Sequence, residues 1–366
     1  MVDKTAPSGA VFLNGEVFPA PDKTLQDISS RIFPPELYFP PNKRSILWRG
    51  VQKMKIAVLG TGFGKEHARL FCREKLVEEI IVWGRKPEKL KEVKTELGVK
   101  TTTNLDDILN NPNIELVDVC LPTKVHAEYA IKALRAGKHV FVEMPLADTT
   151  ENGQKILETA KECNRRVFVD LFLQFEYPYQ LLKQMKEENR YGECIDFYIR
   201  RQTPQWWGNL DLDNIALSLM HHDIDYVLQL LGKPDSIQAS GRNVRPECSA
   251  VTALMSFKKA TATIRADSAL ADKCPFSVGF EATFEKAFIR YFEDGYQDGR
   301  TDTKLEIFTN DRQEEVKLVQ QNCYELVCHD VVESILENKP SRLDIEHALL
   351  TLKTIVQMNG MMCGGQ

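Results

Sequence analysis

The residues best suited to proton transfer lie in LSLMHHDIDYVLQLLG, residues 217–232. Histidine gives or takes a proton near neutral pH, and interconversion of a carbonyl and an alcohol requires one proton. At helical spacing, His222, Asp225 and Ser218 fall on one face, opposite an apolar stripe, so Asp225 could orient His222 or raise its basicity. His221 lies at the edge of the stripe. A solvated polar face is the alternative interpretation.

A second segment, VLGTGFGKEHARLF, predicts phosphate binding. Gly60, Gly62 and Gly64 lie between a β-prone run and a helical pattern. Glycine lets backbone amides approach a pyrophosphate, and the helix N-terminus attracts the anion. In this context the motif predicts a dinucleotide site that includes Phe63. The G-x-G-x-G spacing is one residue shorter than the common form, so we expect a tighter loop.

The segment EEIIVWGRK indicates which dinucleotide is bound. The position that usually carries an Asp or Glu for the ribose hydroxyls is Gly84, and Arg85 and Lys86 follow it. Without the carboxylate a 2′-phosphate is not repelled, and the two cations attract it. We therefore expect NADP(H) in preference to NAD(H), with NAD(H) also possible. A solvated basic turn is the alternative.

Two more strand ends should reach the same cofactor site, because the carboxyl ends of parallel strands form it in a doubly wound sheet. In LVDVCLPTKVH, Thr123 can bond to the cofactor, and the favoured interpretation of His126 is a structural helix-start residue. In HVFVEMP, Glu143 becomes a cofactor neighbour, and Pro145 fixes the turn that carries Met144. The residues expected at the cofactor from these segments are Pro122, Thr123, His126, Glu143 and Met144.

The elements that position these residues predict an α/β fold: a Rossmann doubly wound parallel sheet followed by an α+β domain with a large open, mostly antiparallel sheet. From Met54, continuous apolar strands alternate with helices, as in a parallel sheet covered on both faces. After about residue 175, alternating stretches predict antiparallel strands. The expected parts are an N-terminal extension 1–53, a dinucleotide-binding domain 54–172, and a substrate and oligomerisation domain 173–366, whose last helix, about 342–360, is expected to pack back on the Rossmann domain.

The extension is rich in proline and carries one local signal. AVFLNGEVF places Asn14 and Gly15 between two short β-prone runs, which predicts a tight hairpin. A disordered tail is the alternative.

The composition argues against several classes of function. A net charge of −5 leaves no basic excess for nucleic acid or an anionic membrane. The chain has neither a visible signal peptide nor an apolar window of roughly 18 residues that could span a bilayer. Nine scattered cysteines without zinc or redox spacing predict free thiols in a reducing cytoplasm and no metal site.

The segments GTGFGKEHA, PTKVHAEYAIKALRAGKHVFVEMPLA and HHDIDYVLQLLGKP, in this order, resemble the Gfo/Idh/MocA family of NAD(P)-dependent oxidoreductases over about residues 54–360. The resemblance implies homodimers or homotetramers formed through the C-terminal sheet. It also implies oxidation or reduction of a carbon bearing oxygen on sugars, nucleotide-sugars or cyclitols, with His222 as acid/base.

Two motif positions depart from the family pattern. Met144 stands where most members carry a lysine that contacts the reacting hydroxyl and the nicotinamide. Ser218 replaces an aspartate that supports the histidine. A lysine cation near the reacting oxygen can stabilise the transition state by several kcal/mol, whereas a thioether contributes packing only.

A third departure follows the last Rossmann strand, where FLQF replaces an arginine-bearing segment of the type N-R-R-F. His222 then needs a different partner, for which Tyr177 and Tyr179 are candidates. The tryptophan pair in QTPQWWGNLD could stack on a sugar ring, and a core pair is the alternative. The residues expected near the substrate are Gln174, Trp206, Trp207, His221 and Ser218.

Three hypotheses follow. The first is an NADP(H)-dependent oxidoreductase acting on a sugar-derived, nucleotide-sugar or cyclitol-like substrate. The second is a reductase of a less polar ketone or an imine, since Met144, Phe172 and Leu173 make the pocket less ionic. The third is a catalytically inactive cofactor-binding regulator or scaffold, with the extension as its partner-binding element.

Overall fold

The computed structural model describes residues 11–13, 16–18 and 53–363 of the chain. In the extension, β1 (Val11–Leu13) and β2 (Glu16–Phe18) pair in antiparallel register. This confirms the predicted strands of the hairpin, while the turn residues Asn14 and Gly15 lie outside the described residues.

The first domain is built on a six-stranded parallel sheet of order β5-β4-β3-β6-β7-β8. Its strands are β3 (Met54–Leu59), β4 (Val77–Trp83), β5 (Lys100–Thr102), β6 (Leu116–Val119), β7 (His139–Val142) and β8 (Val167–Val169). The helices between them are α1 (Phe63–Phe71), α2 (Pro87–Leu97), α3 (Asp106–Leu109), α4 (His126–Arg135) and α5 (Thr150–Glu162), with a short 3-10 helix η3 (Thr123–Val125). The central strands are buried on both faces, which explains their continuous apolar sequences. The strand order reverses between β3 and β6, so ligands are expected beyond the carboxyl ends of these two strands.

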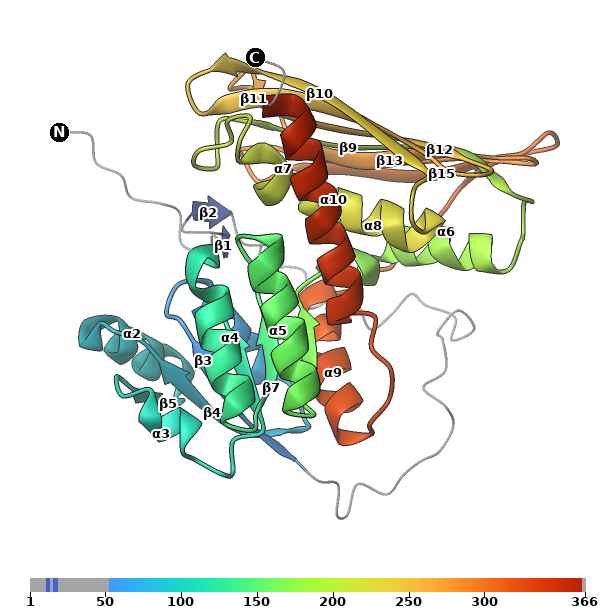
Figure 1. Ribbon diagram of the computed structural model, residues 1–366. Coiled ribbons are helices and arrows are strands. Elements are labelled where there is room, and N and C mark those ends of the chain that lie inside the picture. Colours follow the sequence, from blue (N-terminus) through green and yellow to red (C-terminus); the bar gives the residue numbers. More distant parts are fainter. Residues whose placement is uncertain (1–10, 14–15, 19–52, 364–366) are drawn as a thin grey trace.

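The second domain contains an eight-stranded, mostly antiparallel sheet of order β10-β11-β12-β9-β13-β14-β15-β16. Its strands are β9 (Cys194–Pro204), β10 (Ser236–Arg245), β11 (Cys248–Ser256), β12 (Thr261–Leu270), β13 (Phe276–Phe284), β14 (Phe288–Gly295), β15 (Thr301–Phe308) and β16 (Gln313–Glu315). Burial alternates along β11, as expected for a sheet that is covered on one face only. Figure 1 shows α6, α7 and α8 below this sheet and its opposite face bare. The predicted fold class is confirmed.

The remaining helices cover the second sheet or join the two domains. They are η4 (Phe172–Phe175), α6 (Tyr177–Glu187), α7 (Ile215–Ser218), α8 (His221–Leu231), α9 (Cys323–Leu336) and α10 (Ile345–Cys363). The α9 helix returns to the Rossmann domain and packs on α1 and η4, whereas α10 contacts both α5 and α8 (Figure 1). These two helices therefore fix α8 relative to the parallel sheet.

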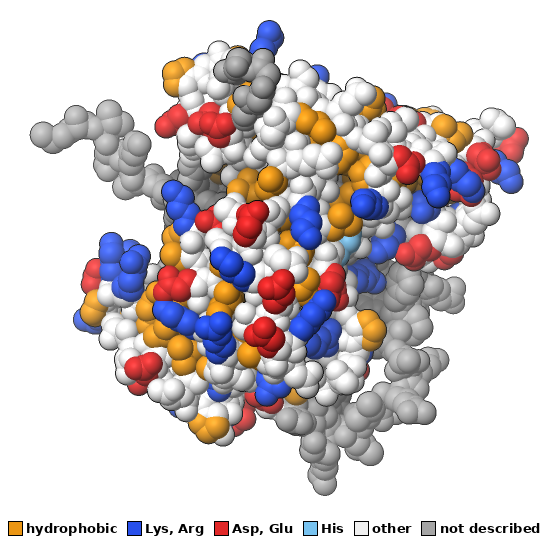
Figure 2. Space-filling view, viewed as in Figure 1, with side chains coloured by type: hydrophobic (Ala, Val, Ile, Leu, Met, Phe, Trp, Pro, Cys, Tyr) orange, Lys and Arg blue, Asp and Glu red, His pale blue; other side chains and the backbone are white. Residues whose placement is uncertain are grey.

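The surface of the described residues shows no segregation of charge on the face drawn in Figure 2, where basic and acidic side chains are interspersed over both domains. No helix among the described residues is long and apolar enough to cross a membrane. The eight cysteines whose side chains are described are all unpaired.

Candidate active site

The glycine turn between β3 and α1 has the geometry of a phosphate cradle. Gly60 has φ +129°, and a Cβ there would lie 2.2 Å from the carbonyl oxygen of Cys120, so only glycine fits. Gly62 caps α1 without a side-chain hydrogen bond, and no described atom lies within 4 Å of where its Cβ would be. The space beside Gly62 at the N-terminus of α1 is therefore open, which suits the pyrophosphate of a dinucleotide.

The end of β4 offers positive charge where an acid is common. A Cβ on Gly84 would lie 2.7 Å from the Thr61 side chain. Arg85 and Lys86 are exposed at the start of α2, and neither forms an ion pair with another described residue. Both cations are thus free to meet a phosphate on the adenosine ribose.

The end of β6 is tied to the end of β7 by a histidine. Pro122 and Thr123 lead into η3, and His126 begins α4. Nδ1 of His126 lies 2.9 Å from the Pro145 carbonyl oxygen and Nε2 lies 2.6 Å from that of Leu121. Both ring nitrogens contact backbone carbonyls, so this geometry gives His126 a structural role and does not support cofactor binding by its side chain. Burial lowers its pKa.

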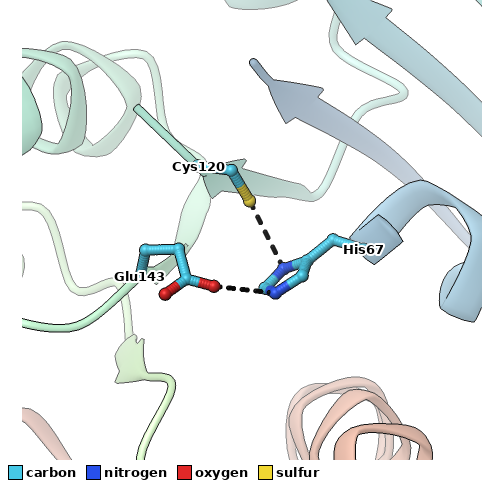
Figure 3. Close-up of side chains that lie close together, drawn as sticks. All are labelled: His67, Cys120 and Glu143. Carbon is cyan, nitrogen blue, oxygen red and sulfur yellow. Dashed lines mark hydrogen bonds and ion pairs between the residues drawn. The ribbon is translucent and has the colours of Figure 1, made fainter. Parts of the chain in front are cut away.

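Glu143, at the end of β7, belongs to a buried ionic cluster that the sequence reasoning missed. Its Oε1 lies 2.8 Å from Nε2 of His67 on α1 (Figure 3). On the other side of the same ring, Nδ1 of His67 lies 2.9 Å from Oδ2 of Asp118. Asp170, which follows β8, lies 3.5 Å from Nε2. The available signals were single acids inside apolar runs, LVDV and VFVD, and a histidine just after the glycine turn.

The protonation of this cluster follows from its contacts. Burial opposes a charge on His67, but the Asp118 and Asp170 carboxylates outweigh it and raise the pKa well above 6.5. Burial, together with repulsion from Asp170, raises the pKa of Glu143 to about 7 against the opposing effect of His67. His67 is therefore an imidazolium that lies between carboxylates.

His67, Cys120 and Glu143 are close enough to suggest a metal site, because their ligand atoms lie within 4.8 Å of one another. The thiol, however, contacts Nδ1 at 3.3 Å, while Glu143 contacts Nε2 on the opposite side of the ring (Figure 3). A single ion binds one ring nitrogen at about 2.0 Å and cannot take ligands from both sides. The arrangement is that of a hydrogen-bonded ionic cluster.

The segment predicted as one helix is broken into α7 and α8, with Leu219 and Met220 between them. Ser218 consequently lies on the separate helix α7 and is exposed, so it does not share a helical face with His222. The polar face of α8 is not solvated: His221 is 0% and His222 is 7% exposed. Burial, then the neighbouring cation Arg201 and His221, lower the pKa of His222 well below 6.5, and burial lowers that of His221 to about 4.

Asp225 does not pair with His222, contrary to our expectation. Its Oδ1 lies 3.0 Å from Nε2 of His347 and accepts a 3.0 Å hydrogen bond from Thr351. Its Oδ2 accepts a 3.3 Å hydrogen bond from Gln174, which also donates to the Arg342 carbonyl. Asp225 and Gln174 therefore hold η4, α8 and α10 together. The prediction was wrong because helical spacing within one segment does not reveal a partner on a distant helix.

A row of aromatic contacts brings His222 to the glycine turn. The ring of His222 lies 4.4 Å from Phe172, Phe172 lies 4.8 Å from Tyr324, and Tyr324 lies 6.1 Å from Phe63, between ring centroids. Tyr324 lies in the first turn of α9, and no local pattern in the sequence indicated it because it lies far along the chain. These rings connect the start of α1 with the acid/base candidate on α8.

The other candidates lie on different elements. Tyr177 begins α6 and is partly exposed, whereas Tyr179 is buried in the core against Tyr226. Trp206 and Trp207 are partly exposed and make an edge contact at 6.4 Å, and Trp207 also packs on Phe276.

Comparison with known proteins agrees with this architecture. The model of the oxidoreductase family with an NAD-binding Rossmann fold, GFO_IDH_MocA, matches residues 54–171. An uncharacterized oxidoreductase of Schizosaccharomyces pombe is 32% identical over 209 residues, 53% of this chain and 56% of the relative. Inositol 2-dehydrogenase of Pseudomonas savastanoi is 30% identical over 184 residues, 49% of this chain and 54% of the relative. The matched part thus spans about half the length of these curated relatives.

Among solved structures, UDP-N-acetylglucosamine 3-dehydrogenase of Acidithiobacillus ferrooxidans has the same fold, with a TM-score of 0.72 and 21% identity. The superposition covers 85% of this chain and 98% of the other. Residues 54–171 thus match the NAD-binding Rossmann domain of the Gfo/Idh/MocA oxidoreductase family, and the chain shares its two-domain fold with this solved structure.

Proposed function

We propose that the chain is an NADP(H)-dependent oxidoreductase that transfers hydride to or from the C=O/C–OH carbon of a sugar-derived, nucleotide-sugar or cyclitol-like substrate. The observation that carries the proposal is the row of rings from Phe63 to His222, which joins an uncapped helix N-terminus to a buried imidazole. The names of two relatives, an inositol dehydrogenase and a UDP-sugar dehydrogenase, support this class of substrate.

The preference for NADP(H) over NAD(H) rests on the end of β4. Gly84 leaves no carboxylate to repel a 2′-phosphate, and Arg85 and Lys86 are exposed and free of described ion pairs. Gly62, Pro122, Thr123, Glu143 and Met144 are proposed to line the rest of the dinucleotide site.

The bound nicotinamide would supply or accept the hydride. His222, neutral because of its buried position beside Arg201, is suited to accept the hydroxyl proton of an alcohol as the carbonyl forms, and to return it in reverse. Met144 is 7% exposed and offers packing but no charge, so the chemistry depends on His222 more than in members with the lysine.

The test is turnover of NADPH or NADP+ against a panel of keto sugars, nucleotide-sugars and cyclitols. We expect His222→Ala to reduce kcat on the active substrate by about 10²-fold or more, as for loss of a general acid/base. The matched control is His329→Ala, since His329 lies half-exposed on α9 and contacts Glu74. Full activity of the His222 variant would remove His222 from the mechanism.

The apolar lining favours a second candidate, reduction of an uncharged cyclic ketone or imine. Phe172, whose ring contacts His222, and Tyr324, whose ring contacts Phe172, add no charged group to the row, so Arg201 is the one charged neighbour described for His222. A higher kcat/KM for such a substrate than for a keto sugar would select this candidate. Tight NADPH binding without turnover of any substrate would instead select the inactive regulator.

The bare face of the eight-stranded sheet is the proposed surface for a homodimer or homotetramer. On it Leu254, in β11, is 40% exposed. Analytical ultracentrifugation of the wild type and Leu254→Glu tests this, and an unchanged oligomer in the variant would exclude that surface. The unpaired cysteines agree with a proposed cytoplasmic location.

A further inference from the structure

Glu143, proposed above to line the dinucleotide site, belongs to a buried ionic cluster whose other members, His67, Asp118 and Asp170, have no part in the mechanism so far. The cluster joins α1 to the ends of three neighbouring strands, β6, β7 and β8. Buried charges are costly to remove from water, so such a cluster requires either close pairing or a function. Its position suggests the function.

The cluster lies under the part of the cofactor site that would hold the nicotinamide. A dinucleotide with its pyrophosphate on the Gly60–Gly62 turn extends one half over β4 and the other over β6 and β7. Because Arg85 and Lys86 lie at β4, the nicotinamide half falls to β6 and β7. Glu143 directly follows β7, and its side chain is 12% exposed, whereas those of His67, Asp118 and Asp170 are at most 2% exposed. Glu143 is thus the member that can face a ligand.

The cluster contains more negative than positive charge. Three carboxylates surround one imidazolium, His67. The other titratable neighbours of Glu143 are the Cys120 thiol and the Tyr324 phenol, and burial raises the pKa of each well above its usual value, so both stay neutral. An oxidised nicotinamide ring carries a positive charge and a reduced ring carries none. A net negative site therefore stabilises the oxidised form selectively.

We propose that His67 is a positioning residue that holds the Glu143 carboxylate, ionised, at the nicotinamide ring, and that this pair makes the protein bind the oxidised cofactor more tightly than the reduced one. The inference rests on the proposed cofactor site and deepens it, because it assigns a redox-state preference to that site.

The proposal predicts how the preference depends on pH. Glu143, with its pKa near 7, is protonated below that pH, and the preference for the oxidised cofactor is then weakened, since one negative charge of the cluster is removed. Above that pH the carboxylate is ionised and the preference is at its full size. Since His67 lowers the pKa of Glu143, removal of His67 must move the transition to higher pH.

The experiment measures the dissociation constants of NADP+ and NADPH from pH 5.5 to 9 by fluorescence and calorimetry. The quantity compared at each pH is the ratio of the two constants, because a general loss of affinity affects both equally and cancels. In the wild type we expect the ratio to favour NADP+ about tenfold more at high pH than at low pH, which is the effect expected from one carboxylate charge interacting with the nicotinamide ring. Glu143→Gln should give a ratio that does not change with pH. His67→Gln, which retains a hydrogen-bond donor, should shift the midpoint upward.

The matched control is His139→Gln, at the opposite end of the same strand as Glu143. His139 accepts from the Arg166 amide, and burial lowers its pKa to about 4, so the ratio and its midpoint should not change. Thermal melts at each pH identify variants that fail to fold. If His67→Gln is one of them, Asp118→Asn provides a second measurement, because it removes the carboxylate that pairs with Nδ1 of His67.

Two results would overturn the inference while leaving the proposed function intact: a wild-type ratio independent of pH, or an unchanged midpoint in a folded His67→Gln protein. Failure of the wild type to bind either form would overturn both the inference and the proposed function.

Discussion

Buried histidines on the two domains have opposite charge states. His67, on the Rossmann side, contacts carboxylates of Asp118 and Glu143, and its pKa is raised. His222, on α8, lies beside Arg201 and His221, and burial and these neighbours lower its pKa. Both imidazoles are buried, so burial alone does not set their charge. The neighbours make one histidine a fixed cation and the other a neutral proton acceptor.

The two sides also differ in how well the ring nitrogens of their histidines are partnered. On the Rossmann side, both ring nitrogens of His67 are ion-paired, although Oδ1 of Asp170 is buried without a hydrogen-bond partner among the described residues. On the α8 side, both ring nitrogens of His221 and Nδ1 of His222 are buried without a hydrogen-bond partner among the described residues. Buried polar groups without a partner are rare, and a hydrogen bond to a bound water, ion or ligand usually explains them. We therefore expect the substrate to meet the α8 side.

The largest effect on cofactor binding and stability is expected from a substitution of Gly60 in the Rossmann domain. Gly60→Ala places a Cβ 2.2 Å from the Cys120 carbonyl in a backbone conformation of φ +129°. We expect loss of measurable cofactor binding and a loss of about 3 kcal/mol or more in the free energy of unfolding. Calorimetry and denaturant titration measure these. Gly98→Ala is the control, since Gly98 also has positive φ but no atom within 4 Å of the added Cβ, and normal binding by both variants would refute the cradle.

The next effect concerns the cation beside His222. Arg201 donates two 2.9 Å hydrogen bonds to Asp223, and both residues are buried. Arg201→Met leaves Asp223 unpaired, so we expect the free energy of unfolding to fall by about 3–5 kcal/mol. Loss of the cation should also raise the pKa of His222, which NMR titration of the folded variant can measure. An unchanged pKa of His222 in the variant would show that Arg201 does not set the charge state of this histidine.

A smaller effect is expected at the other end of the cofactor. Arg85→Ala removes a charge-assisted contact to the 2′-phosphate, so we expect NADPH affinity to fall about tenfold or more while NADH affinity stays constant. Lys89→Ala is the control, because Lys89 pairs with Glu92 one turn later on α2. Equal affinity of the wild type for NADPH and NADH would contradict the proposed preference.

The smallest effect tests the role that the structure gives to Asp225. Asp225→Asn removes the anion paired with His347, and we expect a loss of about 1–2 kcal/mol with little change in kcat. Burial opposes a charge on His347, but Asp225 raises its pKa above 6.5. The stabilisation is therefore full below pH 6.5 and is lost as the pH rises through the raised pKa; in the variant this dependence should disappear. A large loss of kcat at constant stability would instead restore Asp225 as the partner of His222.

The sequence predicted the fold and the position of the glycine turn between β3 and α1 because these signals are local. Apolar strands, a glycine turn and strand-end residues such as Glu143 occur in order along the Rossmann domain, and its topology brings the strand ends together. The α8 side depends on contacts between distant segments. Helical spacing did not reveal the break at Met220, the pairing of Asp225 with His347, or the ring of Tyr324 beside Phe172. Single buried acids such as Asp118 were visible, but their shared partner His67 was not.

The most direct test of the account is a crystal structure of the protein with bound NADP+. We predict that the pyrophosphate lies on the Gly60–Gly62 turn, that Arg85 or Lys86 contacts the 2′-phosphate, and that the nicotinamide lies beside Glu143 with His222 facing its C4 atom. A dinucleotide bound elsewhere, or a nicotinamide ring that points away from both Glu143 and His222, would contradict the account.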